Sequence, residues 1–276
     1  VETALKLLGG IGISGLTLNS PLWGLYALII ALPFLPNEAT LIFAAVVVFS
    51  FFIKTAVNKE KDFVKDPVAM PLMAFALVQI ITTLISVEPV LSAQNLVVSL
   101  VSLALYFVIV NTLKTKKDFD KAMKIFIITA FILSIYGIMQ YFTLGTTSKA
   151  WVDVNLNPDL ETRVVGTFGN PNVFAEYLEH ILPVAITLVF VYRKWLNKII
   201  MGSIAGVMFV CLVLTFSRGG YLGFVSAAML FVLLKMAKFI PLFIAGGIAA
   251  IPLLPNVVLQ RINTIGNVQD TSNAYR

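Results

Sequence analysis

Long apolar stretches alternate with short polar connections along the chain. These stretches, about 16 to 22 residues each, match the length at which an α-helix crosses the hydrocarbon core of a bilayer. Because lipid offers the backbone no hydrogen-bond partner, each crossing segment is expected to be helical. The pattern predicts an all-α, polytopic membrane bundle in which residues 1–276 form a single transmembrane domain. About nine spans are expected, at 20–36, 39–54, 68–86, 91–113, 122–143, 173–192, 199–216, 220–236 and 238–254.

The composition agrees with a membrane protein and excludes an ordinary soluble domain. Hydrophobic residues make up 59% of the chain and charged residues only 12%, against roughly 25% in soluble domains. The mean hydropathy is +0.93. The single cysteine, Cys211, lies inside a predicted span, and no second cysteine is present for a disulfide. It is interpreted as a small apolar packing residue.

Lysine and arginine fall on opposite sides of the predicted spans. Fourteen of the fifteen lysines precede the first span or occupy every second connection, whereas four of the five arginines lie on the other side. By the positive-inside rule the lysine-rich side is cytoplasmic. The net charge of +6 is therefore read as a topology signal, and no nucleic-acid partner is expected. The outer side carries the longest connection, about 144–172, and a polar tail at about 255–276.

The outer connection ends in a string that is typical of an ordered loop: Thr162-Arg163-Val164-Val165-Gly166-Thr167-Phe168-Gly169-Asn170-Pro171-Asn172. Gly166 permits unusual backbone angles, and Asn170 followed by proline favours a turn. Asn172 is expected to cap the span that follows. The string therefore predicts an ordered re-entry into the membrane. Arg163 is either a solvated loop residue or part of an anion site.

A second outer string, Thr215-Phe216-Ser217-Arg218-Gly219-Gly220-Tyr221, joins two spans with almost no loop. Arg218 is therefore expected at the outer membrane boundary, where an arginine needs a partner, water or lipid phosphate. One interpretation is snorkelling to lipid; the other is an anion site, in which Gly219 adds an open backbone N–H. Two guanidinium groups on one face, Arg163 and Arg218, would suit a diphosphate, because each offers paired donors to phosphate oxygens.

Together the two strings resemble motifs of the O-antigen ligase and O-antigen polymerase-like family of membrane glycosyltransferases. The likeness follows span order from about 91 to 276, and its specific part is Arg163-x-x-Gly166-x-Phe168-Gly169-Asn170-Pro171-Asn172 with Thr215-x-Ser217-Arg218-Gly219. The resemblance implies a multi-pass protein of the bacterial cytoplasmic membrane that assembles cell-envelope polysaccharide. Members transfer a glycan from undecaprenyl diphosphate to an acceptor on the extracytoplasmic face, without a metal or other cofactor. Arg163 and Arg218 would match the family arginines that bind the diphosphate, with Gly166, Asn170, Asn172, Glu176 and Gly219 as supporting residues.

One departure from the family concerns the group that would activate the acceptor. The family has an essential histidine in a large outer loop after the second string, whereas the only histidine here is His180. We therefore expect the chain to be part of a longer protein, and the catalytic residue stays unassigned. No leader segment is recognised before the first span. His180 and Glu176 share a helix face, where they form a structural pair, line the substrate cavity, or relay protons or bind metal.

Two further function classes stay open from the sequence. A transporter or flippase for a lipid-linked or anionic substrate would place ionisable groups near the bilayer midplane and would show matching repeats with broken helices. A membrane scaffold would not depend on the arginines. Small residues at Gly202 and Gly206, and at Gly219 and Gly223, predict close helix approach. The acceptor, whether lipid, wall polymer, protein or glycan, leaves no recognisable pattern in these residues.

Overall fold

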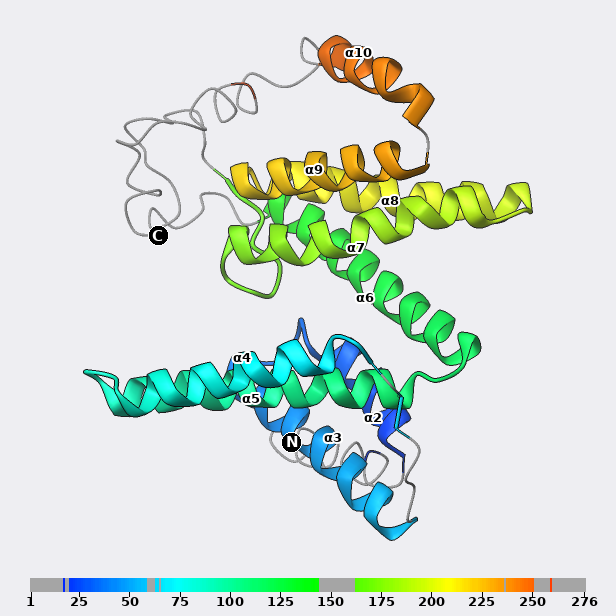
Figure 1. The fold of residues 1–276 in the computed structure, drawn as a ribbon. Helices are drawn as coiled ribbons and strands as arrows, with labels where there is room; N and C mark the ends of the chain where they lie inside the picture. Colours follow the sequence, from blue (N-terminus) through cyan, green and yellow to red (C-terminus); the bar gives the residue numbers. More distant parts are fainter. Residues whose placement is uncertain are drawn as a thin grey trace, which may run out of the picture. The chain divides into compact units, whose positions relative to one another are not determined.

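The computed structural model describes residues 17, 20–58, 63–64, 66–143, 162–235, 237–250 and 259. Within these residues the chain is helical and contains no strand, which confirms the all-α class. Residues 144–161 of the predicted outer connection at about 144–172, and most of the tail over 255–276, lie outside the described residues. The helices are α2 (Pro21–Ala31), α3 (Asn37–Val57), α4 (Ala69–Leu84), α5 (Pro89–Thr112), α6 (Lys116–Thr143), α7 (Pro171–Val191), α8 (Trp195–Leu214), α9 (Arg218–Lys235), the 3-10 turn η2 (Ala237–Phe239) and α10 (Ile240–Ala250) (Figure 1).

Six of the described helices, α3 and α5 to α9, are long and apolar enough to cross a membrane. The other predicted spans correspond to shorter helices, of 11 residues in α2, 16 in α4 and 11 in α10. Eleven residues extend about 16 Å, against a hydrocarbon core of about 30 Å. The expectation of about nine spans is therefore supported for six. Hydropathy overestimated the first span because apolar residues continue into the turn after Ala31, where Pro33 provides no N–H for a helix.

The chain contacts group into two compact units, residues 1–126 and 127–276, with the boundary inside α6. In the first unit α5 packs against both α3 and α4, and α2 packs against α3. Its core is a cluster of apolar side chains from α2, α3 and α5: Leu25, Leu28, Ala44, Val47, Phe51 and Val108. By contrast α4 buries no residue. It packs along α5, and the two helices form a hairpin (Figure 1).

The start of α2 and the start of α6 meet within the first unit. The ammonium of Lys121 lies 4.1 Å from the ring centroid of Trp23 and 4.8 Å from that of Tyr26. The Tyr26 hydroxyl donates to the carbonyl of Asp118 at 3.2 Å. A lysine over two aromatic rings is a favourable cation–π arrangement. The contact brings together two helix ends that the lysine pattern assigns to the same side.

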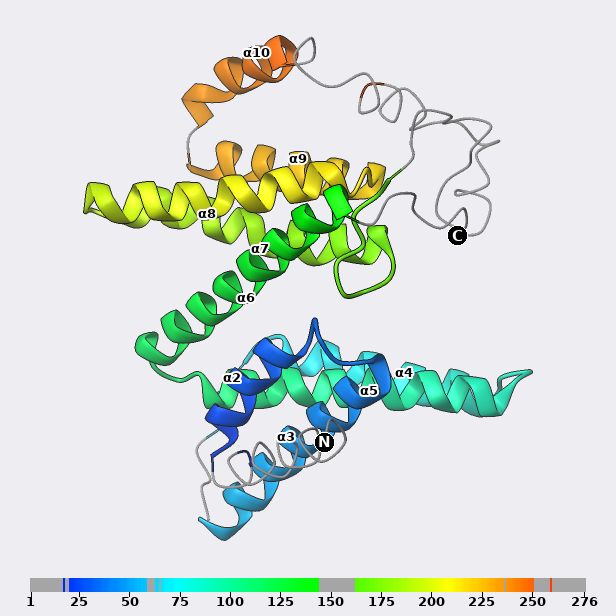
Figure 2. The ribbon, with the colours of Figure 1, turned by 180° about the vertical axis from the view of Figure 1, so that it is seen from behind.

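In the second unit α7 packs against α8 and α9, and the last turns of α6 join them (Figure 2). Gly137 of α6 is a point of close approach, since a Cβ there would lie 2.8 Å from Val164 and 2.9 Å from the sulfur of Cys211. Cys211 is fully buried, which agrees with its interpretation as a packing residue. The large apolar side chains in the core of this unit include Phe174, Leu178, Ile181, Leu182, Met208 and Leu212.

The glycines of α8 and α9 differ in whether they allow another helix to pack closely. A Cβ at Gly202 or Gly206 would meet nothing within 4 Å, so the close helix approach predicted there is absent from the described part of the chain. On α9 the close approach is real and involves Gly220 and Gly223. A Cβ at Gly220 would lie 2.8 Å from Ala175, and one at Gly223 would fall against the Glu179 carboxylate. Small residues therefore set the α7–α9 distance.

Candidate functional site

The second string forms a tight turn between α8 and α9. Thr215 continues the backbone hydrogen bonding of α8, donating to the carbonyls of Cys211 and Leu212 at 3.2 Å each. Phe216 then adopts a left-handed conformation with φ of 48°, which is unusual for a residue with a large side chain. Strained backbone of this kind persists only where surrounding contacts determine it. The contacts that hold this turn come from the first string.

The first string is an ordered segment that leads into α7, as predicted. Gly166 and Gly169 both lie in the left-handed region, with φ of 59° and 66°. The helix cap is Asn170, whose side chain accepts from the backbone N–H of Asn172 at 2.9 Å, while Pro171 occupies the first helical position. The prediction that Asn172 caps α7 was therefore wrong by two residues. This shift releases the Asn172 side chain for another role.

Arg163 is buried and binds the turn between α8 and α9. Only 4% of its surface is exposed. Its Nε donates to the carbonyl of Thr215 at 2.9 Å, and Nη2 donates to the carbonyl of Phe216 at 3.3 Å and to Oδ1 of Asn172 at 3.0 Å. A planar guanidinium can satisfy several acceptors at once in this way, which an ammonium cannot copy. Arg163 therefore acts on the turn backbone, and it is not a solvated loop residue.

Asn172 completes the connection between the two strings. Its Oδ1 accepts from Arg163 and also from the hydroxyl of Ser217 at 3.0 Å. The backbone adds one bond, from the N–H of Val164 to the carbonyl of Leu214 at 3.1 Å. Segments about 50 residues apart are thus joined into one buried polar cluster. Buried polar networks of this kind fix a single arrangement when their members are satisfied.

Gln140, near the end of α6, supports the same cluster. Its amide Nε2 donates to the carbonyl of Gly166 at 2.8 Å, and its Oε1 accepts from the N–H of Gly166 at 2.9 Å. The aromatic ring of Phe174 closes the other side, since a Cβ at Gly166 would lie 3.0 Å from it. No motif in the sequence singles out Gln140. Its signal was only that a buried amide in a span needs a partner.

Arg218 is the first residue of α9 and has a different environment from Arg163. It is half-buried, and the neighbouring Gly219 is exposed. The Ser217 hydroxyl accepts from the N–H of Gly220 at 3.4 Å, which is the geometry of a helix cap. The first turn of a helix offers N–H groups without intrahelical acceptors and the positive end of the helix dipole. Arg163 thus lies inside the cluster, whereas Arg218 follows the cluster residue Ser217 at the helix terminus.

The acidic residues of α7 and His180 lie further along the helix than the cluster residue Asn172. Glu176 and His180 are exposed, and Nδ1 of His180 lies 2.6 Å from the backbone carbonyl of Glu176. The shared helix face is therefore present, but the contact runs to the peptide and not to the Glu176 carboxylate. Glu179 is half-buried and faces Gly223 of α9. These contacts do not form the structural Glu176–His180 pair that the sequence left open, since both side chains are exposed and the imidazole contacts a backbone carbonyl.

Among the described residues, no three side chains of His, Cys, Asp or Glu come together in a group that could hold a metal ion. Comparison of the chain with known protein families, with curated proteins and with solved structures gave no match.

Proposed function

We propose that the chain takes part in glycosyl transfer from an undecaprenyl-diphosphate-linked glycan to an acceptor on the extracytoplasmic face of a bacterial cytoplasmic membrane. The observation that carries this proposal is the interlocked pair of strings. Arg163 and Asn172 hold the α8–α9 turn so that Arg218 begins α9 beside it. The same two strings carry the resemblance to O-antigen ligase-like glycosyltransferases. The product would be a cell-surface polysaccharide or a glycan attached to its final carrier.

The two arginines take different roles in this proposal. Arg218 contacts the diphosphate, together with the backbone N–H of Gly219 and the positive end of the α9 dipole. Arg163 is a positioning residue, because its donors bind the carbonyls of Thr215 and Phe216 and so set the direction of α9. Positive groups that are in place before the reaction stabilise the negative charge that develops on the leaving diphosphate. Electrostatic stabilisation of this kind is usually the largest contribution to catalysis.

The chemical step follows from these placements. The bond between the anomeric carbon and the diphosphate oxygen breaks, and the electron pair leaves with the diphosphate. The acceptor hydroxyl oxygen forms the new bond to the anomeric carbon and releases its proton to a base. No base is assigned among the residues described above. The role of Arg218 is to carry the negative charge of the leaving group, which needs no metal ion at the residues named.

Membrane orientation is part of the proposal. The lysine-rich connections face the cytoplasm, so the α8–α9 turn and the segment before α7 lie at the outer face. The helices α3, α5, α6, α7, α8 and α9 are the candidates for crossing the bilayer, because each is an apolar helix of at least 18 residues. Membrane lipids and the lipid-linked donor are the partners that this orientation implies.

Binding of the donor can be tested directly on the full chain in lipid nanodiscs. The probe is undecaprenyl diphosphate, and undecaprenol is the control ligand that has the same tail without the diphosphate. We expect Arg218→Lys to weaken binding of the diphosphate by about ten- to a hundredfold, because a charge-assisted contact is worth about 1.5 to 3 kcal/mol. The matched control is Arg193→Lys, which changes an exposed arginine on the lysine-rich side. Equal binding of the two lipids, or unchanged binding by Arg218→Lys, would remove the basis of the proposal.

The reaction itself separates a transferase from a transporter. The chain is incubated with a defined undecaprenyl-diphosphate glycan and candidate acceptors, and the products are identified by mass spectrometry. A transferase yields a new glycosidic bond and free undecaprenyl diphosphate. A flippase moves the intact donor between leaflets without changing its mass. The second result would replace glycosyl transfer with the transport alternative.

A further inference from the structure

The first unit contains a cavity that the proposed function does not use. It has a volume of about 760 Å³, within the range of roughly 300 to 1,000 Å³ that is typical of small-molecule sites. Residues of α5 line it from Gln94 to Leu105, which is about 16 Å along the helix axis. Most of the wall is aliphatic and comes from α2, α3 and α5: Leu28, Leu32, Leu41, Ala44, Val97, Val98, Val101 and Leu105.

One end of this cavity is polar. Asn37 and Glu38 begin α3 there, and Gln94 and Asn95 lie in the second turn of α5. The only charged residue in the lining is the acid Glu38. Within the described part of the chain, the side chains of Glu38, Gln94 and Asn95 make no hydrogen bond or ion pair. The cavity is therefore amphipathic, with an aliphatic interior and an acidic, amide-rich end.

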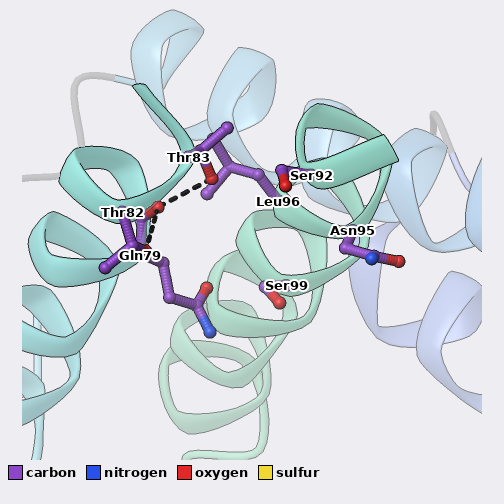
Figure 3. Close-up of a pocket in the computed structure, with 7 residues that line it drawn as sticks. All are labelled: Gln79, Thr82, Thr83, Ser92, Asn95, Leu96 and Ser99. Carbon is purple, nitrogen blue, oxygen red and sulfur yellow. Dashed lines mark hydrogen bonds between the residues drawn. The ribbon is translucent and has the colours of Figure 1, made fainter. Parts of the chain in front are cut away.

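A second, smaller cavity lies on the other side of α5, against α4. Its volume is about 270 Å³, and its lining is almost wholly polar: Gln79, Thr82, Thr83, Ser92, Asn95, Leu96 and Ser99 (Figure 3). Both threonine hydroxyls donate to the backbone carbonyl of Gln79, at 3.0 and 2.8 Å. The side-chain oxygen Oε1 of Gln79 is buried and has no hydrogen-bond partner among the described residues. A buried acceptor without a donor is costly, so a donor from outside the chain would be bound favourably there.

Asn95 lines both cavities, so the polar cavity adjoins the polar end of the aliphatic one. We propose that the two cavities together bind one lipid, with its hydrocarbon chain in the α2–α3–α5 cavity and its headgroup at Asn95, the residue that lines both. The headgroup donates hydrogen bonds and carries no net negative charge. Two observations support this chemistry independently: the carboxylate of Glu38 repels an anion, and Oε1 of Gln79 needs a donor. An ammonium headgroup and a sugar headgroup share this property.

The inference does not depend on glycosyl transfer. A diphosphate requires cationic partners, and the lining of these two cavities contains none. The site is therefore chemically opposite to the cluster around Arg218. A membrane protein with both sites would bind an anionic lipid at one and a neutral or amine lipid at the other.

Lipid selectivity is measured on the full chain by native mass spectrometry after delipidation. The probes are phosphatidylethanolamine, phosphatidylglycerol and a diglycosyl diacylglycerol in equimolar amounts. We expect the amine lipid and the glycolipid to be retained over phosphatidylglycerol. Glu38→Gln should reduce retention of the amine lipid by about two- to fivefold, as for an exposed ion pair, and should affect the glycolipid less. The matched control is Glu88→Gln, because Glu88 is an exposed acid that lines neither cavity.

A blocking variant tests the aliphatic cavity itself. Leu41→Trp fills the cavity and should abolish retention of every probe at this site. Ile42→Trp adds the same ring to the next residue of α3, which is 65% exposed and does not line the cavity, and should retain lipid. Thermal unfolding of each variant reports whether it folds. If Leu41→Trp does not fold, the comparison of Glu38→Gln with Glu88→Gln tests the proposal. Equal retention of phosphatidylglycerol, or no difference within either pair of variants, would overturn the proposal.

Discussion

The Nε atom of Arg163 donates to the backbone carbonyl of Thr215 at 2.9 Å, across 52 residues of sequence. Through this bond a residue that precedes α7 holds the end of α8. The same guanidinium reaches the carbonyl of Phe216, the residue with the left-handed backbone. Arg163 and Arg218 look alike in the sequence but have different surroundings: Arg163 is buried, and Arg218 lies at the start of α9.

This separation predicts different effects for the same substitution. Arg163→Lys leaves buried carbonyls of the α8–α9 turn without donors, so the free energy of unfolding should fall by about 1 to 3 kcal/mol. Arg218→Lys should change it by less than about 0.5 kcal/mol, because Arg218 is only half-buried. Chemical unfolding in detergent measures both. The division of roles fails if Arg218→Lys destabilises the chain as much as Arg163→Lys does.

Gln140 provides a second prediction about the cluster. Gln140→Leu keeps the approximate shape but leaves the buried N–H and carbonyl of Gly166 unpaired, which costs about 1 to 3 kcal/mol for each group. Amide hydrogen exchange at Gly166 should also become faster. Gln94→Leu is the control, because the Gln94 side chain makes no hydrogen bond within the described residues. If both variants unfold at the same denaturant concentration, the Gln140 contact does not hold the segment.

The glycines of the first string differ in how much space surrounds them. Gly166 and Gly169 both have positive φ, so an alanine at either position costs about 1 to 2 kcal/mol of backbone energy. At Gly166 the added Cβ also meets the fully buried ring of Phe174 at 3.0 Å, whereas nothing lies within 4 Å at Gly169. We therefore expect Gly166→Ala to lower the midpoint of thermal unfolding more than Gly169→Ala. The reverse order would contradict the packing of Phe174 on the segment.

Side-specific labelling tests the orientation and whether α4 crosses the bilayer. In a Cys211→Ala background, cysteines are introduced at Asn58 and Glu88, which are exposed and flank α4. A membrane-impermeant maleimide should label Glu88→Cys in intact bacterial cells and Asn58→Cys only after permeabilisation, because the proposed orientation puts the lysine-rich side in the cytoplasm. Labelling of both sites from the same side would mean that α4, with 16 residues, does not cross the bilayer.

Much of the fold was accessible from the sequence because hydropathy is a local property. The α7 span was predicted within two residues of its bounds, since proline and asparagine mark its start clearly, and the end of α6 was predicted at Thr143. The short α2 was not, because its apolar composition continues into a turn. Within the site, Arg163 and Arg218 were singled out from their strings, but Gln140 and the cap at Asn170 were missed. The partners of these side chains depend on which helices meet.

The sequence by itself determined that the chain is a helical membrane protein, where its helices fall, and which two strings carry arginine. Lipid forces each backbone to satisfy its own hydrogen bonds, so composition alone predicts helices there. Only the tertiary structure decided that Arg163 is directed at the α8–α9 backbone and that Asn172 accepts from both strings. Those bonds depend on helix packing between distant segments, where Gly137 and Gly220 allow close approach. No local pattern of residues encodes such a contact.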